Sequence, residues 1–304
     1  MPEPWQVLAV RNRHPRDQNI VFDEPSHTYT VHGSSKGYIS STKFVHEFFP
    51  HFDADAVIKK MMRGPKWPLH KLYGKTAEEI KALWNANGKE ASGLGTAMHL
   101  AIEQFLNGAE DVIVPAVKET AEWRYFQNFW RECGGDLEPY RMEWEVYVRQ
   151  IKLAGSIDGV FRRRSDGRFV IYDWKRSKEI KQDNKYETGY APLDHLPNTN
   201  YWHYTMQLNV YRWILKNHYD MDIADLYLVI LHPNNGNYVR IRLNILEDEV
   251  LDMVECRSRA VESGRDVAVI LPVPGDAEGG EGESDEEGGG GGADNDAVCM
   301  IKIC

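Results

Sequence analysis

The alternation of apolar and polar positions predicts the first helix and strand of the chain. Between Gly93 and Leu106, apolar residues recur every three or four positions, which is the spacing of one face of an α-helix. From Arg141 to Gln150, apolar and polar residues alternate, with Trp144, Val146 and Val148 on one side. We therefore expect a helix followed by a strand that buries one face.

The same reading predicts further elements downstream. Two strands, Ile151 to Arg163 and Arg168 to Lys175, are separated by a turn-rich stretch of four residues. A helix follows from about Tyr201 to Asn217. The apolar run Leu226 to Leu231 then indicates a buried strand, which turns into another strand near Tyr238 to Leu243. This order of helix, three strands, helix and strand predicts a mixed α/β core.

Composition restricts the class of protein. The 304 residues are 42% hydrophobic, which is enough for one large core, and no run reaches the roughly 18 to 20 apolar residues of a membrane span. The first residues lack the basic and apolar regions of a signal peptide, so we expect an intracellular protein. Cysteines at positions 133, 256, 299 and 304 form no C-x-x-C pair and are expected to be free thiols.

Charge is unevenly distributed along the chain. The formal net charge is −10, but residues 276–296 contain nine acids and no Lys or Arg, so the rest of the chain is nearly neutral. We expect residues 275–304 to be a disordered acidic, glycine-rich tail. Upstream we expect a mostly helical N-terminal portion, residues 1–90, and a catalytic core, residues 91–268.

The two central strands place charged groups opposite each other. If residues 164–167 form the loop, counting back along the hairpin sets Asp158 opposite Asp173, and Lys175 shares the face of Asp173. Facing carboxylates repel each other unless a cation lies between them, and their oxygens suit Mg²⁺ or Mn²⁺. The alternative is a solvated strand face, because this spacing of two Asp and one Lys also arises by chance.

The sequence around these residues resembles a known family. The stretches GSIDG (residues 155–159) and IYDWKRSK (residues 171–178) resemble the two strand motifs of the RecB-like branch of PD-(D/E)XK nucleases. The resemblance implies a restriction-endonuclease-like core, in which helices flank a mixed central sheet. It also implies a Mg²⁺- or Mn²⁺-dependent phosphodiesterase with Asp158, Asp173 and Lys175 at its centre.

Two flanking helices strengthen the resemblance. GTAMH (residues 95–99) looks like the G-x-x-x-H motif of that branch, which implies that His99 is a metal ligand; a lone helical His is otherwise more often structural. QLNVY (residues 207–211) resembles the Q-x-x-x-Y motif, so Gln207 and Tyr211 are implied to orient groups of the site. Glu143 matches the acid that commonly precedes the GSID strand, and Glu145 is its rival.

The resemblance extends from roughly residue 20 to residue 243 and is greatest to RecB-like nucleases of large DNA viruses, in stretches such as YDWKRSK and NYWHYTMQLNVY. We therefore expect a viral protein that works in the cytoplasm or nucleus of a host cell. The sequence departs from the iron–sulfur members, because no Cys precedes His99 and no cysteine cluster follows the core. We expect no Fe–S cluster.

The expected partner is DNA with ends or single-stranded regions. Arg162, Arg176 and Lys178 are candidate phosphate contacts, although basic residues near a turn are often merely solvated. Trp67 lies in a stretch that interleaves basic and aromatic residues, which could stack on unpaired bases. The expected function is an exonuclease or end-dependent nuclease in replication, recombination or repair. The alternatives are an RNA substrate and a catalytically inactive nucleic-acid-binding module that keeps the fold.

Overall fold

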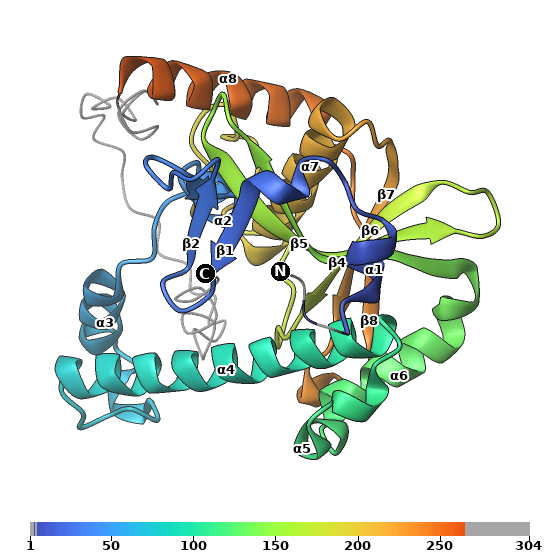
Figure 1. The fold of residues 1–304 in the computed structure, drawn as a ribbon. Helices are drawn as coiled ribbons and strands as arrows, with labels where there is room; N and C mark the ends of the chain where they lie inside the picture. Colours follow the sequence, from blue (N-terminus) through green and yellow to red (C-terminus); the bar gives the residue numbers. More distant parts are fainter. Residues whose placement is uncertain (1–2, 4, 265–304) are drawn as a thin grey trace.

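A mixed six-stranded sheet forms the centre of the molecule (Figure 1). The computed structural model describes residue 3 and residues 5–264; the tail at 275–304 and two of the four cysteines lie outside these residues. Cys133 and Cys256 are free thiols, as expected. The strands of this sheet are β3 (Ile39–Ser40), β4 (Leu137–Val148), β5 (Leu153–Arg163), β6 (Phe169–Lys175), β7 (Ile223–Ile230) and β8 (Val239–Arg242).

Strand β5 pairs with other strands along both of its edges. Along one edge it pairs antiparallel with β4 over its whole length. Along the other edge, β3 pairs with Leu153 and Ala154, and β6 pairs with residues 159–162. Within the described part of the chain, residues 155–158 therefore have no strand partner on that edge. This interruption separates β5 from β6 and leaves room for side chains between them.

Helices cover both faces of the sheet. On one face, α2 (Ser41–His46), α7 (Asn200–His218) and α8 (Glu247–Ser263) enclose the largest apolar core, which includes Trp144 and Ile171. On the other face, α4 (Ala77–Leu106) and α6 (Ala121–Cys133) pack against Tyr172 and Trp174. The period-two alternation of β6 explains this division, since its successive side chains enter opposite cores. The mixed α/β class, with helices on both faces of a mixed central sheet, is confirmed.

The N-terminal part contributes one strand to the main sheet. A small hairpin of β1 (Ile20–Asp23) and β2 (Thr28–Val31) precedes β3, which joins the main sheet. The predicted boundary at residue 90 lies inside α4, which continues from one predicted part into the other. The remaining elements are α1 (Val7–Arg11), α3 (Ala54–Arg63), α5 (Pro115–Lys118) and the 3₁₀ turns Asp17–Asn19, Trp67–Leu69 (η2), Glu110–Val112, Gly134–Asp136 and Pro233–Asn235.

Helix α4 is longer than the apolar pattern predicted. It begins sixteen residues before Gly93, where Thr76 and Glu79 form a capping box: each side chain accepts a hydrogen bond from the backbone N–H of the other. The pattern missed this part because residues 85–96 are exposed on nearly every side and so carry no apolar stripe. None of the helices in the described residues is long and apolar enough to cross a membrane.

Candidate metal and active site

The hairpin of β5 and β6 has the predicted register. The Arg163 N–H donates to the Arg168 carbonyl at 2.9 Å, and the last paired residues are Gly159 and Tyr172. One further step along both strands sets Asp158 opposite Asp173, as counted from the sequence. Beyond this point β6 continues without β5 beside it, and the polar backbone groups on that edge need other partners.

Side chains satisfy these backbone groups at Trp174. Its N–H donates to Asp158 Oδ2 at 2.9 Å, and its carbonyl accepts a hydrogen bond from His99 Nε2 at 2.8 Å. On the opposite edge of β6, the Lys175 carbonyl accepts from the Leu231 N–H of the β7 side. His99 and Asp158 therefore fill the gap between β5 and β6 and complete the edge of β6.

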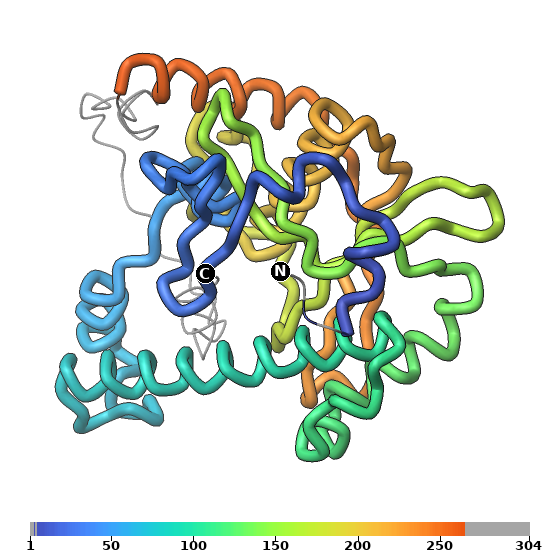
Figure 2. Tube along the Cα trace, viewed as in Figure 1, coloured from blue at the N-terminus to red at the C-terminus, as the bar shows by residue number. Residues whose placement is uncertain are grey.

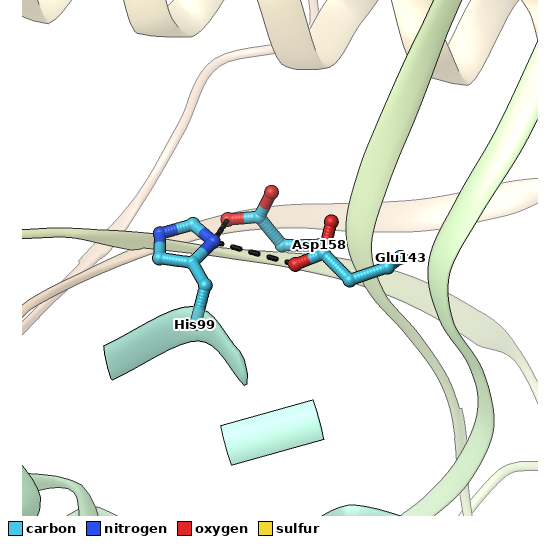
Figure 3. Close-up of side chains that lie close together, drawn as sticks. All are labelled: His99, Glu143 and Asp158. Carbon is cyan, nitrogen blue, oxygen red and sulfur yellow. Dashed lines mark hydrogen bonds and ion pairs between the residues drawn. The ribbon is translucent and has the colours of Figure 1, made fainter. Parts of the chain in front are cut away.

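The bond to Trp174 orients the His99 ring. A carbonyl oxygen only accepts, so Nε2 carries the proton and Nδ1 is the atom that faces the carboxylates. Nδ1 lies 3.4 Å from Glu143 Oε1 and 3.5 Å from Asp158 Oδ2 (Figure 3). Burial alone would lower the pKa of His99, but the neighbouring Asp158 and Glu143 carboxylates outweigh burial and raise its pKa to about 9. Without a metal, the ring is therefore protonated and lies between two carboxyl groups.

His99, Glu143 and Asp158 fit a divalent ion. One ligand atom from each lies within 4.8 Å of the others, close to the roughly 4.2 Å between opposite ligands of one Mg²⁺ ion. Loss of the Nδ1 proton would leave a lone pair beside two carboxylates, and the Trp174 carbonyl already holds the ring in the required tautomer. Two of the three ligand atoms are carboxylate oxygens, which suit Mg²⁺ or Mn²⁺.

A change of faces along β4 brings Glu143 to this cluster. Glu143 has a left-handed backbone, φ 42°, and the strand changes face there: Trp144 packs in the core below α7, whereas Met142 packs in the core below α4. Its Oε2 accepts a hydrogen bond from Ser156 at 3.1 Å. The rival Glu145 lies apart from the cluster, where burial raises its pKa to about 7 and the Phe22 N–H of β1 donates to it.

Asp173 and Lys175 form a buried ion pair beside the cluster. Lys175 Nζ lies 2.6 Å from Asp173 Oδ2 and 5.1 Å from the centre of the Tyr204 ring. Burial, followed by the Asp158 carboxylate, raises the pKa of Asp173 to about 6. Burial lowers the pKa of Lys175, but the Asp173 and Asp158 carboxylates raise it by more than burial lowers it. The ammonium therefore keeps its charge. Tyr204 was missed in the sequence, although it lies one helical turn before Gln207.

Helix α7 supports the hairpin from behind. Gln207 Nε2 donates to Thr42 Oγ1 at 3.0 Å and to the Tyr211 hydroxyl at 3.4 Å, so the predicted pair shares one face and is tied to α2. Both side chains are buried. Gly155 is required beneath them, because a Cβ there would lie 2.6 Å from Ser41 Oγ and 2.7 Å from the Tyr211 ring. Thr42 and Ser41 carry no pattern that would reveal this role from the sequence.

One buried acid on α4 lies near the cluster without joining it. Glu103, one turn after His99, accepts a hydrogen bond from Gln6 Nε2 at 2.8 Å. Burial, followed by the Glu143 carboxylate, raises the pKa of Glu103 to about 7. Gln6 lies ninety-seven residues before Glu103, so no local pattern could have predicted this contact.

The expected DNA contacts are dispersed. Arg162 is exposed near the tip of the β5–β6 hairpin, four residues or about 13 Å from Asp158, and Figure 2 shows this tip projecting beyond the sheet. Arg176 is half-buried against Glu122 at 2.7 Å, whereas Lys178 is exposed. Trp67 packs into a small apolar cluster far along α4 from His99. Arg176 and Lys178 follow β6 directly, within three residues of Lys175, and Arg162 lies on β5 at the end away from Asp158.

Comparison with known proteins identifies the family. No curated protein sequence matches the chain. The solved structure titled "Crystal structure of SSO0001" is 16% identical, covers 74% of this chain and 76% of that one, and superposes with a TM-score of 0.30, a likeness too low to support a conclusion. The family model of the PD-(D/E)XK nuclease superfamily matches residues 66–268, two thirds of the chain, which include the whole cluster described above. The chain belongs to the PD-(D/E)XK nuclease superfamily.

Proposed function

We propose that the protein is a metal-dependent DNA nuclease. Its site for phosphodiester hydrolysis lies between β5 and β6. The observation that carries this proposal is His99 Nδ1, held by the Trp174 carbonyl to face Glu143 and Asp158 with all three ligand atoms within 4.8 Å. A bound ion at this position would also offset the repulsion between the Glu143 and Asp158 carboxylates.

The ligands that we propose for Mg²⁺ or Mn²⁺ are His99, Asp158 and Asp173, as the sequence indicated, together with Glu143. A bound ion would polarise a phosphate oxygen and activate a water molecule. Asp158 has a second contact: its Oδ2 accepts a hydrogen bond from the Trp174 N–H, which fixes the carboxylate in position. Two of these ligands are therefore positioned by the backbone of β6.

Lys175 acts as a cation in this proposal. Asp173 at 2.6 Å and the Tyr204 ring hold its ammonium in place, and its raised pKa keeps it protonated at neutral pH. It can donate hydrogen bonds to the attacking water or to a phosphate oxygen and offset developing negative charge, but it cannot serve as a base. Gln207 and Tyr211 position the hairpin from α7, through Thr42 and Gly155.

We propose DNA with ends or single-stranded regions as the substrate and replication, recombination or repair as the process. The resemblance of the G-x-x-x-H and Q-x-x-x-Y helices to RecB-like nucleases supports this choice. Nothing in the sequence resembles a base-reading module, so recognition should depend on backbone geometry and strand state. Arg162, Arg176, Lys178 and Trp67 remain proposed contacts.

The test uses the purified full chain with labelled linear duplex, closed circular duplex, single-stranded DNA and RNA of the same sequence, in Mg²⁺, in Mn²⁺ and in EDTA. We expect metal-dependent cutting of linear DNA and survival of closed circles. Lys175→Ala should abolish turnover and still bind metal, while the exposed Lys36→Ala serves as the matched control. Failure to cut any substrate, or cutting of RNA alone, would overturn the proposal, and near-normal activity of Lys175→Ala would show that the site is elsewhere.

A further inference from the structure

Residues 54–84 form a small body with a core of its own. We call this segment the basic arm; it comprises α3, η2 and the first part of α4. Ile58, Leu72, Ile80 and Trp84 are buried against one another, and the half-buried Trp67 packs around them. This cluster is distinct from the cores on the two faces of the sheet. The arm is thus folded by its own contacts rather than by packing on the nuclease core.

An exposed length of α4 joins the basic arm to the site. Between residues 85 and 96, all but Gly88 and Gly95 are exposed, so this part of the helix crosses solvent. Trp84 and His99 are fifteen residues apart on α4, which corresponds to about 22 Å along the helix axis. Figure 1 shows α3 beside one end of α4, opposite the end that packs on the sheet.

The charge of the basic arm is opposite to that of the chain. Residues 54–84 contain seven basic residues and three acids, in a protein with a net charge of −10. Lys59, Lys60 and Arg63 are exposed on α3, and within the described residues none of the three has an acidic partner. The Tyr73 ring is also 58% exposed. Clustered exposed cations beside an exposed ring complement a nucleic-acid strand rather than an apolar partner.

We propose that the basic arm binds the phosphate backbone of the substrate about six base-pair steps away from the bond being cut. This inference rests on the proposed function. The separation of about 22 Å corresponds to six or seven steps of 3.4 Å along a duplex. The exposed length of α4 spans this distance. Binding energy from the arm therefore contributes only for substrates long enough to reach it.

The test compares two triple variants of equal charge change. Lys59→Ala, Lys60→Ala and Arg63→Ala remove cations from the arm. Lys36→Ala, Arg149→Ala and Arg259→Ala remove exposed cations from two turns and from α8, outside the basic arm. Figure 1 shows α8 along the edge of the molecule opposite α4. Each protein is assayed for metal-dependent cutting of a hairpin DNA with a stem of about four base pairs, about 14 Å long, and of a linear duplex of about thirty base pairs. Thermal unfolding checks that both variants fold.

We expect the arm variant to cut the short hairpin at the wild-type rate and to lose at least about tenfold in kcat/KM on the long duplex. Its binding to the long duplex in EDTA should depend less on salt, with the slope of log affinity against log salt reduced by about 2 to 3 for three lost contacts. The control variant should match the wild type on both substrates. Equal losses on both lengths, or no loss on the long duplex, would overturn the proposal.

The two proposals fail separately in this experiment. If the wild type cuts neither substrate while the arm variant still shows the reduced salt slope, the basic arm binds DNA and the nuclease function is refuted. If the wild type cuts both substrates and the arm variant is indistinguishable from it in rate and in salt slope, the nuclease function stands and the basic arm is refuted.

Discussion

Asp173→Asn separates the chemical role of this buried acid from its cost to the fold. Asparagine has nearly the shape of aspartic acid but never ionises, so it removes the charge while filling the same space. Asp173 is 2% exposed and faces Asp158 across the hairpin, with Lys175 as its cationic partner. We expect the variant to lose cleavage and, in the absence of metal, to become more stable than the wild type.

The size of the effect follows from the pKa of Asp173. Burial, and then the Asp158 carboxylate, raise it from 3.8 to about 6. Because the folded protein holds this proton more tightly than the unfolded chain, native stability is lost as pH rises from about 4 to about 6. A shift of about two pKa units corresponds to about 3 kcal/mol at pH 8. Asp173→Asn should regain up to this amount at pH 8 and less than about 1 kcal/mol at pH 4.

Urea unfolding in EDTA at pH 8 and pH 4 measures these differences directly, and gel assays with Mg²⁺ measure cleavage. The matched control is Asp225→Asn: that buried carboxylate accepts hydrogen bonds from Arg163 and Arg242, so its loss should destabilise the protein at pH 8. An Asp173→Asn protein that is less stable than the wild type at pH 8, or whose gain is the same at both pH values, would refute the electrostatic reasoning. Retained cleavage would refute the assignment of Asp173 to the site.

Three further predictions test the surroundings of the site. Because the pKa of His99 is about 9 without metal, a bound ion must displace the Nδ1 proton. Calorimetry should therefore find that metal affinity rises by up to about tenfold per pH unit from pH 7 to 9. An affinity that does not change with pH would argue against ligation by Nδ1. Glu143→Gln should lower kcat by at least about 100-fold while Glu145→Gln stays within about twofold, and equal losses would contradict the choice between them. Gly155→Ala should destabilise the fold by about 1 to 3 kcal/mol in denaturant titrations, because its Cβ would meet the Tyr211 ring at 2.7 Å; an unchanged midpoint would contradict this packing.

Local periodicity was sufficient to predict the hairpin that carries the site. The turn residues 164–167 fix the pairing of Arg163 with Arg168, and alternation then determines which side chains share a face. The same reasoning failed for the first half of α4, because a helix that crosses solvent has no apolar stripe to report it. Strand β3 was missed for another reason: two residues are too few to show alternation.

Contacts between distant segments limited the prediction of the site. The sequence indicated His99, Asp158 and Asp173 as ligands and Glu143 as a further candidate; the three-residue cluster contains Glu143, and Asp173 pairs with Lys175 beside it. Glu143 reaches the cluster through a left-handed backbone at a non-glycine residue, which sequence pattern does not predict. Its partner Ser156 gave no signal either.

The hydrogen bonds at Trp174 make one backbone amide a natural reporter of the site. Its proton is held by Asp158 Oδ2, and the Trp174 carbonyl in the next peptide group accepts from the His99 ring, so a change at either side chain should alter the shielding of this N–H. In an isotope-labelled sample this resonance should shift when metal is added. Hydrogen exchange there should also slow, because ligation restrains the Asp158 side chain that protects the amide. The Trp174 amide would thus give a spectroscopic signal of metal binding in the absence of substrate.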